Sequence, residues 1–73
     1  MMNKDKGYVL KNSDGMYFTG YNHADSQLRK ALIYHSEKYA AESANDINSN
    51  ENRMPSVKHD FRLVKIEIME VSE

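Results

Sequence analysis

The sequence contains no cysteine, which excludes disulfide bonds and zinc sites built on thiolates. The absence of cysteine also fits a reducing compartment. The longest uninterrupted apolar run, ALIY at residues 31–34, is far shorter than the roughly 20 residues of a membrane-spanning helix. The charged residues near the N-terminus are not followed by the apolar segment of a signal peptide. We therefore expect a cytoplasmic protein without a membrane partner.

No charge of one sign dominates, because 10 Lys and Arg face 11 Asp and Glu. A protein that binds nucleic acid without sequence preference normally has a basic face, and a nucleic-acid mimic has an acidic excess. Neither is present in the overall composition. A local basic patch keeps a nucleic-acid-binding accessory protein as the alternative hypothesis, and its candidate residues are Lys4, Lys6, Lys11, Arg29 and Lys30.

Large aliphatic and aromatic core residues are scarce: four Leu, four Ile, four Val and two Phe in 73 residues. The net charge of −1 is nevertheless too small to keep such a chain unfolded. We expect one small domain over residues 1–73 with a thin core, flexible at residues 1–6. Since no disulfide or metal can support this core, self-association as a homodimer through a sheet edge or face is expected.

The strongest local pattern is a hairpin over residues 8–21. Two β-rich runs, YVLK and MYFTGY, flank NSDG, and Asp-Gly between alternating runs is typical of a hairpin turn. A three-residue loop pairs Lys11 with Tyr17 and Leu10 with Phe18, and it gives Gly15 a positive φ. A two-residue loop would mix apolar and polar residues on each face.

The middle of the chain allows two interpretations. Residues 25–47 contain no Gly or Pro and could form one long helix. Alternatively, residues 31–34 are extended and a helix follows over residues 37–46, because Ser36 is a good N-cap and Glu37 favours the positive helix end. We prefer the second interpretation, because in one long helix the stripe of Ala40, Ala44 and Ile47 would be displaced from the stripe of Leu28, Leu32, His35 and Tyr39.

The last part of the chain is predicted to be a polar loop over residues 48–58 and a strand over residues 59–71. Val64, Ile66 and Ile68 alternate with charged residues, but Phe61, Leu63, Met69 and Val71 have the opposite parity. Either a bulge near residues 63–64 switches the faces, or both faces are partly apolar. The predicted fold is α+β: an N-terminal antiparallel hairpin, one helix on one face of the sheet, and a C-terminal strand.

No pattern for catalysis, metal binding or a cofactor is visible, so we expect a protein that is not an enzyme. The three histidines lie 12 and 24 residues apart, unlike zinc ligands within one element. The five tyrosines suit a protein interface, nucleobase stacking or the edge of a thin core. One helix leaves one sheet face uncovered, and we predict that it binds a partner. The candidate residues on or beside it are Val9, Lys11, Tyr17, Thr19 and Tyr21.

The order of motifs YVLKN, DGMYFTGY, ALIYHSEKYAAESAND and FRLVKIEI resembles a broad group of very short proteins of phages and prophages of Gram-positive bacteria. The resemblance covers most of residues 7–70, although the tryptophan that these proteins often carry before the Ala-rich segment is missing. Some phage proteins of this size bind and inactivate host defence machinery, including CRISPR effectors. The resemblance thus implies a setting, the host cytoplasm, more than a mechanism. Together with the absent catalytic groups and the available sheet face, it supports a small protein that binds a host protein, such as a defence effector, stoichiometrically.

Overall fold

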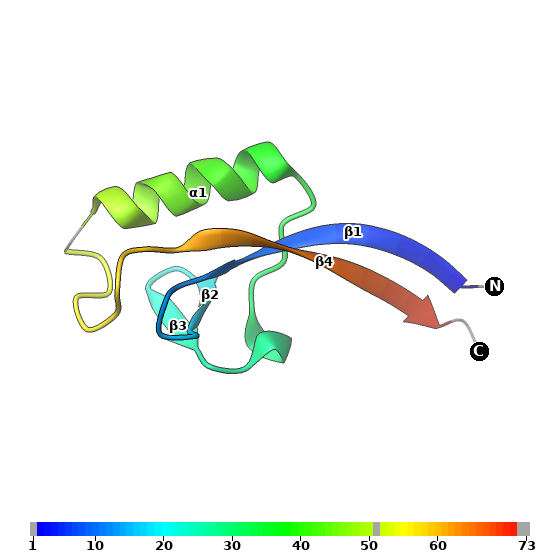
Figure 1. Cartoon of the computed structure of the whole chain (residues 1–73), viewed down its shortest axis with the longest axis horizontal. Coiled ribbons are helices and arrows are strands. Elements are labelled where there is room, and N and C mark those ends of the chain that lie inside the picture. Colours follow the sequence, from blue (N-terminus) through cyan, green and yellow to red (C-terminus); the bar gives the residue numbers. More distant parts are fainter. Residues whose placement is uncertain (1, 51, 72–73) are drawn as a thin grey trace.

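The computed structural model describes residues 2–50 and 52–71; in the two long strands it describes the side chains of residues 6–11 and 62–67. Four strands form one antiparallel sheet in the order β3-β2-β1-β4, and one helix packs on it (Figure 1). This confirms the predicted α+β fold with an N-terminal hairpin and a C-terminal strand. The elements are β1 (Met2–Lys11), β2 (Tyr17–Gly20), β3 (His23–Asp25), the 3₁₀ turn η1 (Leu28–Lys30), α1 (Glu37–Ser49) and β4 (Arg62–Val71).

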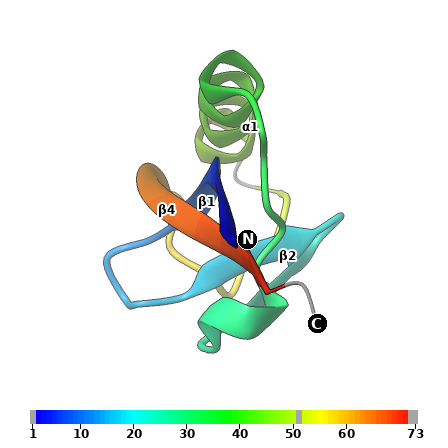
Figure 2. The same ribbon diagram turned by 90° about the vertical axis from the view of Figure 1, so that its right-hand side faces the viewer.

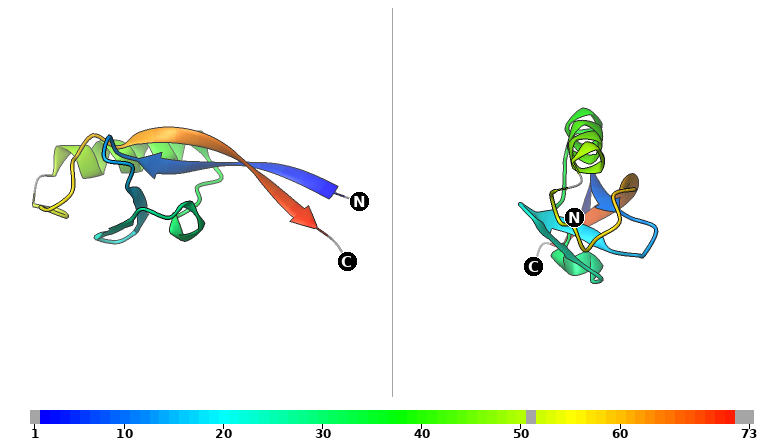
Figure 3. Two further views of the ribbon diagram at one scale, coloured as in Figure 1. Left: turned by 60° about the horizontal axis from the view of Figure 1, so that its bottom comes forward. Right: turned by 90° about the vertical axis from the view of Figure 1, so that its left-hand side faces the viewer.

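The two terminal strands form a long ribbon. β1 and β4 pair over ten residues, from Met2 opposite Val71 to Lys11 opposite Arg62. One end of this ribbon extends well beyond α1, and the molecule measures 45 × 23 × 19 Å (Figures 1 and 3). Residues 2–6, which the sequence analysis expects to be flexible, pair with β4 in this ribbon, and residue 1 lies outside the described residues. The unbroken pairing also excludes a bulge near residues 63–64, so apolar residues stand on both faces of β4.

The hairpin between β1 and β2 has the predicted register. Lys11 pairs with Tyr17, and Gly15 has a φ of +80°. Leu10 and Phe18 both lie in the buried core, as predicted. A period-two pattern and a Gly that tolerates positive φ were sufficient to set this register.

Asn12 organises the loop of this hairpin from a buried position. Its Oδ1 accepts hydrogen bonds from the amides of Asp14 (3.1 Å) and Met16 (2.9 Å), and its Nδ2 donates to the Lys58 carbonyl (3.3 Å). Asp60 adds a second tie, because its Oδ1 accepts a hydrogen bond from the Ser13 amide at 3.1 Å. Hydrogen bonds from the Ser13 side chain and amide hold the pKa of Asp60 below its ordinary value of 3.8.

The middle of the chain follows the second interpretation, and the single long helix is wrong. Tyr34 forms an isolated bridge with Tyr8 in β1, and α1 begins after Ser36, whose Oγ accepts a hydrogen bond from the Tyr39 amide (3.4 Å). None of the helices in residues 2–50 and 52–71 combines the length and apolar character needed to cross a membrane.

The helix is longer than predicted. It ends at Ser49 rather than at residue 46, so the polar loop does not begin at residue 48. Asn48 in the last turn forms two hydrogen bonds of 2.9 Å with the backbone of Phe61, one as donor and one as acceptor. This contact joins residues 13 positions apart and stabilises a turn whose own residues favour loops.

The core lies between α1 and the sheet. The stripe of Ala40, Ala44 and Ile47 on the helix is buried against residues from β1, β2 and the segment before β4; the buried cluster is Leu10, Phe18, Ala40, Ala44, Ile47, Met54 and Phe61. Met54 belongs to the predicted polar loop, yet it is buried with a φ of 52°. The loop thus contributes to the core.

Val9 contradicts the predicted uncovered face. Its exposed fraction is 0%, so it cannot contact a partner. The β2–β3 hairpin is strongly twisted away from the ribbon, and β2, β3 and η1 lie on the side of β1 and β4 opposite α1 (Figures 1 and 2). One helix is therefore not the only cover of the ribbon, because β2, β3 and η1 also lie beside it.

Candidate functional site

Of the remaining predicted site residues, Lys11 and Tyr17 share one face of the hairpin, whereas Tyr21 lies apart from them. Lys11 and Tyr17 lie opposite each other, with Lys11 Nζ 5.4 Å from the centre of the Tyr17 ring, which is the geometry of a cation–π contact. Both residues, and Thr19 in β2, are half-buried. Tyr21 is separate from them, at the tip of the β2–β3 turn. Of the predicted site, only Tyr21 is freely accessible.

Tyr21 has an exposed side chain and a backbone conformation that is energetically unfavourable for tyrosine. Its exposed fraction is 84% and its φ is 58°, in the left-handed region that favours glycine. The turn is tight, because Gly20 pairs with His23 around it. An exposed ring contributes little to the core, so packing does not explain why tyrosine occupies this position.

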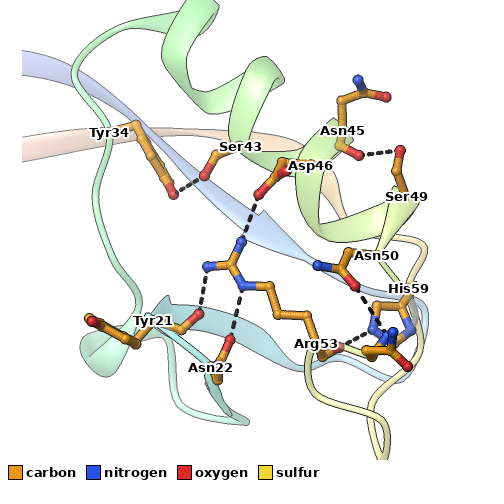
Figure 4. Close-up of polar contacts among 11 residues, drawn as sticks. Tyr21, Asn22, Tyr34, Ser43, Asn45, Asp46, Ser49, Asn50, Arg53 and His59 are labelled. Atoms are coloured by element: carbon orange, nitrogen blue, oxygen red, sulfur yellow. Dashed lines mark hydrogen bonds and ion pairs between the residues drawn. The ribbon is translucent and has the colours of Figure 1, made fainter.

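Arg53 holds this turn in place (Figure 4). Its guanidinium donates to the Tyr21 carbonyl (2.7 Å), to Oδ1 of Asn22 (2.9 Å) and to Oδ2 of Asp46 in α1 (2.8 Å). The same group lies 5.7 Å from the centre of the Phe18 ring. The backbone of the turn is therefore tied to the helix, while the Tyr21 ring points away from Arg53 (Figure 4).

Sequence reasoning missed Arg53. It lies in the predicted polar loop, and its hydrogen-bond partners are 7, 31 and 32 positions away along the chain. No local pattern identifies such a residue, because an isolated arginine between polar residues is typical of any surface loop.

A second accessible feature is an open groove of about 750 Å³ at the start of α1. It is mainly apolar, and it is lined by Ile33, Tyr34, His35, Ser36, Tyr39, Glu42 and Ser43. Tyr34 is fixed by two backbone hydrogen bonds of 2.8 Å with Tyr8 and by a bond of 2.7 Å between its hydroxyl and Ser43 Oγ. Tyr39, with an exposed fraction of 66%, stands on the helix side.

Exposed apolar groups concentrate in one stretch of the chain. The large apolar side chains exposed among the described residues are Tyr21, Leu28, Leu32, Ile33 and Tyr39. All five lie between the β2–β3 turn and the first turn of α1. Aromatic side chains are enriched at surfaces that contact another protein, so Tyr21 and Tyr39 are the first candidates among these five residues.

The described residues show no arrangement suited to metal chemistry. Within residues 2–50 and 52–71, no three His, Asp or Glu side chains are placed to hold an ion. His23 and His35 are exposed, and Nε2 of the half-buried His59 forms a hydrogen bond with the Arg53 carbonyl. His59 thereby supports the loop that carries Arg53.

Comparisons with known proteins add no relative. No family model matches the sequence, no curated protein is significantly similar to it, and no solved structure significantly matches the fold.

Proposed function

We propose that the chain is a small binding protein that acts by stoichiometric contact with another protein, with Tyr21 at the centre of the contact. The observation that carries this proposal is an 84% exposed tyrosine at a φ of 58°. A left-handed backbone costs a residue other than glycine about 1–2 kcal/mol. A residue kept at that cost, without a role in the core, is best explained by what its side chain contacts outside the chain.

The geometry of the turn supports this role. Tyrosine combines a large contact area, few rotatable bonds and a polar tip, and it is enriched at the centres of interfaces. The hydrogen bonds from Arg53 hold the turn before a partner arrives. The partner would therefore bind a ring on an ordered backbone, which lowers the entropy lost on association.

The resemblance to short phage proteins suggests where to look for the partner. We propose a host defence effector, such as a CRISPR nuclease, that is inhibited when the chain binds it. Inhibition of this kind saturates near one chain per target and requires no incubation beyond binding.

The test compares two variants of the full chain. Tyr21→Gly removes the ring and keeps the turn, whereas Lys38→Ala changes an exposed helix residue as a matched control. We expect affinity capture from host cells to retain the same protein with the wild-type chain and with Lys38→Ala. Titration of that protein should show an affinity loss of about thirtyfold with Tyr21→Gly.

Equal affinity of the Tyr21→Gly variant would contradict the proposed contact. Capture that disappears after nuclease treatment and falls steeply with the logarithm of the salt concentration would instead favour the nucleic-acid alternative. Tyr39→Ala shows whether the groove belongs to the same contact surface.

A further inference from the structure

The free edge of β4 carries a self-complementary pattern. β4 is the outermost strand on one side of the described sheet. The amide and carbonyl of Tyr8 are both bonded to Tyr34, on the edge of β1 away from β4. The direction of the backbone N–H and C=O groups alternates along a strand, so the odd-numbered residues of β1 direct these groups toward β4. Their partners in β4 are even-numbered, such as Ile66 opposite Gly7, so the odd-numbered residues of β4 direct their backbone groups outward.

This edge is long and regular. Ten consecutive residues of β4 pair with β1 without interruption, so the outer edge is equally regular. Edges of this kind readily accept a further strand. The end of the ribbon that extends beyond α1 (Figures 1 and 3) consists of residues 2–6 of β1 and 67–71 of β4, and no other described strand pairs with it. Two-stranded ribbons are marginally stable in water. Both features favour an additional strand beside β4.

We propose that this strand is β4 of a second copy of the chain, paired antiparallel about a two-fold axis at Ile66. Such an axis, perpendicular to the sheet, places Ile66 opposite itself. Every other position then meets a complementary residue: Lys65 opposite Glu67, Arg62 opposite Glu70, Val64 opposite Ile68, and Leu63 opposite Met69. The symmetry repeats each of these pairs, so among the described side chains the Lys65–Glu67 pair of opposite charge crosses the interface twice.

The structure is consistent with this register among the described side chains. Arg62, Lys65 and Glu67 are exposed, and Val64 and Ile66 are partly exposed. Opposite charges directly across an antiparallel pair stabilise it, and like charges destabilise it. The outward backbone groups of Lys65 and Glu67 would form the hydrogen bonds on either side of the axis.

No other two-fold register of β4 places opposite charges against each other and apolar residues against apolar residues. An axis at Lys65 or at Glu67 places like charges opposite each other. An axis at Val64 sets Arg62 against Ile66, and one at Ile68 sets Ile66 against Glu70. The free end of β1 does not offer an alternative, since an axis at Lys4 or Asp5 also opposes like charges. The residue types thus select one edge and one register.

The resulting dimer has one continuous eight-stranded sheet, because each copy contributes four strands with β4 at the join. Its two helices lie on the same face. The exposed end of each ribbon lies beside the body of the other copy, because residue 71 pairs with residue 61 of the second chain. Tyr21 lies on the β2–β3 turn, at the opposite side of each sheet, so dimerisation leaves the proposed contact accessible.

The absence of cysteine allows a direct test of the register. In the proposed dimer, Ile66→Cys places two thiols opposite each other in a pair without mutual hydrogen bonds, at a separation that a disulfide can bridge. Val64→Cys is the matched control, because it lies on the same strand face but opposite Ile68. Under mild oxidation we expect Ile66→Cys to form a covalent dimer at least about tenfold faster than Val64→Cys. Equal rates for the two variants would overturn the register.

Charge reversal provides a second test in solution. Wild-type protein should sediment at twice the mass of the 8.5 kDa chain. Lys65→Glu and Glu67→Lys should each weaken the dimer about tenfold, and the double variant should restore it. Lys38→Glu on the helix surface is the control. Since Glu67 also lies opposite Lys6 within the chain, unfolding of each variant is measured in parallel. A wild-type mass of 8.5 kDa up to about 1 mM protein would refute the dimer.

Discussion

Replacing Tyr21 with glycine should make the fold more stable, although it removes a large aromatic side chain. The residue has a φ of 58°, and a left-handed backbone costs an L-residue about 1–2 kcal/mol that glycine avoids. The ring has an exposed fraction of 84%, so its removal takes little apolar surface out of the core. The hydrogen bond from Arg53 goes to the Tyr21 carbonyl and is retained.

The magnitude follows from two opposing effects. Relief of the backbone strain favours the variant, whereas the greater freedom of glycine in the unfolded chain disfavours it by about 0.5–1 kcal/mol. The expected net gain in the free energy of unfolding is about 0.5–1 kcal/mol. For a chain of this size, that gain raises the Tm by roughly 2–6 °C.

Thermal and urea unfolding followed by circular dichroism measure this change, with all proteins at one concentration because a dimer is stabilised by mass action. Tyr21→Ala is the control, since it removes the same ring but keeps the strain; we expect it to be about 1 kcal/mol less stable than Tyr21→Gly. If Tyr21→Gly is less stable than the wild type by more than about 0.5 kcal/mol, the ring contributes to packing. The argument that Tyr21 is kept for an external contact would then fail.

Three further predictions concern the hairpin loop. Asn12→Ala removes three hydrogen bonds of a buried side chain and should lower the free energy of unfolding by about 2–4 kcal/mol in urea denaturation, whereas Asn12→Asp keeps the two accepted bonds and should lose less. Gly15→Ala should cost about 1 kcal/mol through its φ of +80° alone, because an added Cβ would meet nothing within 4 Å, and Gly15→Asn should recover part of that loss in thermal unfolding. The lowered pKa of Asp60 means that its carboxylate stabilises the fold above the ordinary value of 3.8, and this contribution is lost as the pH falls through the lowered pKa. Asp60→Asn should therefore flatten the acid side of a plot of stability against pH, and an unchanged acid side would refute the role of its bonds from Ser13.

Features that depend on residues close together in the chain could be predicted from the amino-acid sequence. The register of the first hairpin follows from period-two alternation and from Gly15, and Ser36 begins the helix because its side chain reaches an amide three residues away. The buried stripe of the helix follows from its period in the same way. In each case the interacting groups lie within one element or one turn, so the local pattern contains the necessary information.

Features that depend on partners far apart in the chain could not be predicted from any local pattern. Val9 is fully buried although the local pattern predicts it on an uncovered face, and α1 continues to Ser49 because the Asn48 side chain forms hydrogen bonds with the backbone of Phe61. Arg53 stabilises the Tyr21 turn through side-chain hydrogen bonds to residues up to 32 positions away in the chain. Whether the pattern of β4 can pair with a second chain likewise depends on which of its edges remains free. Strand order and loop closure settle these points, and both are properties of the folded chain rather than of any local segment.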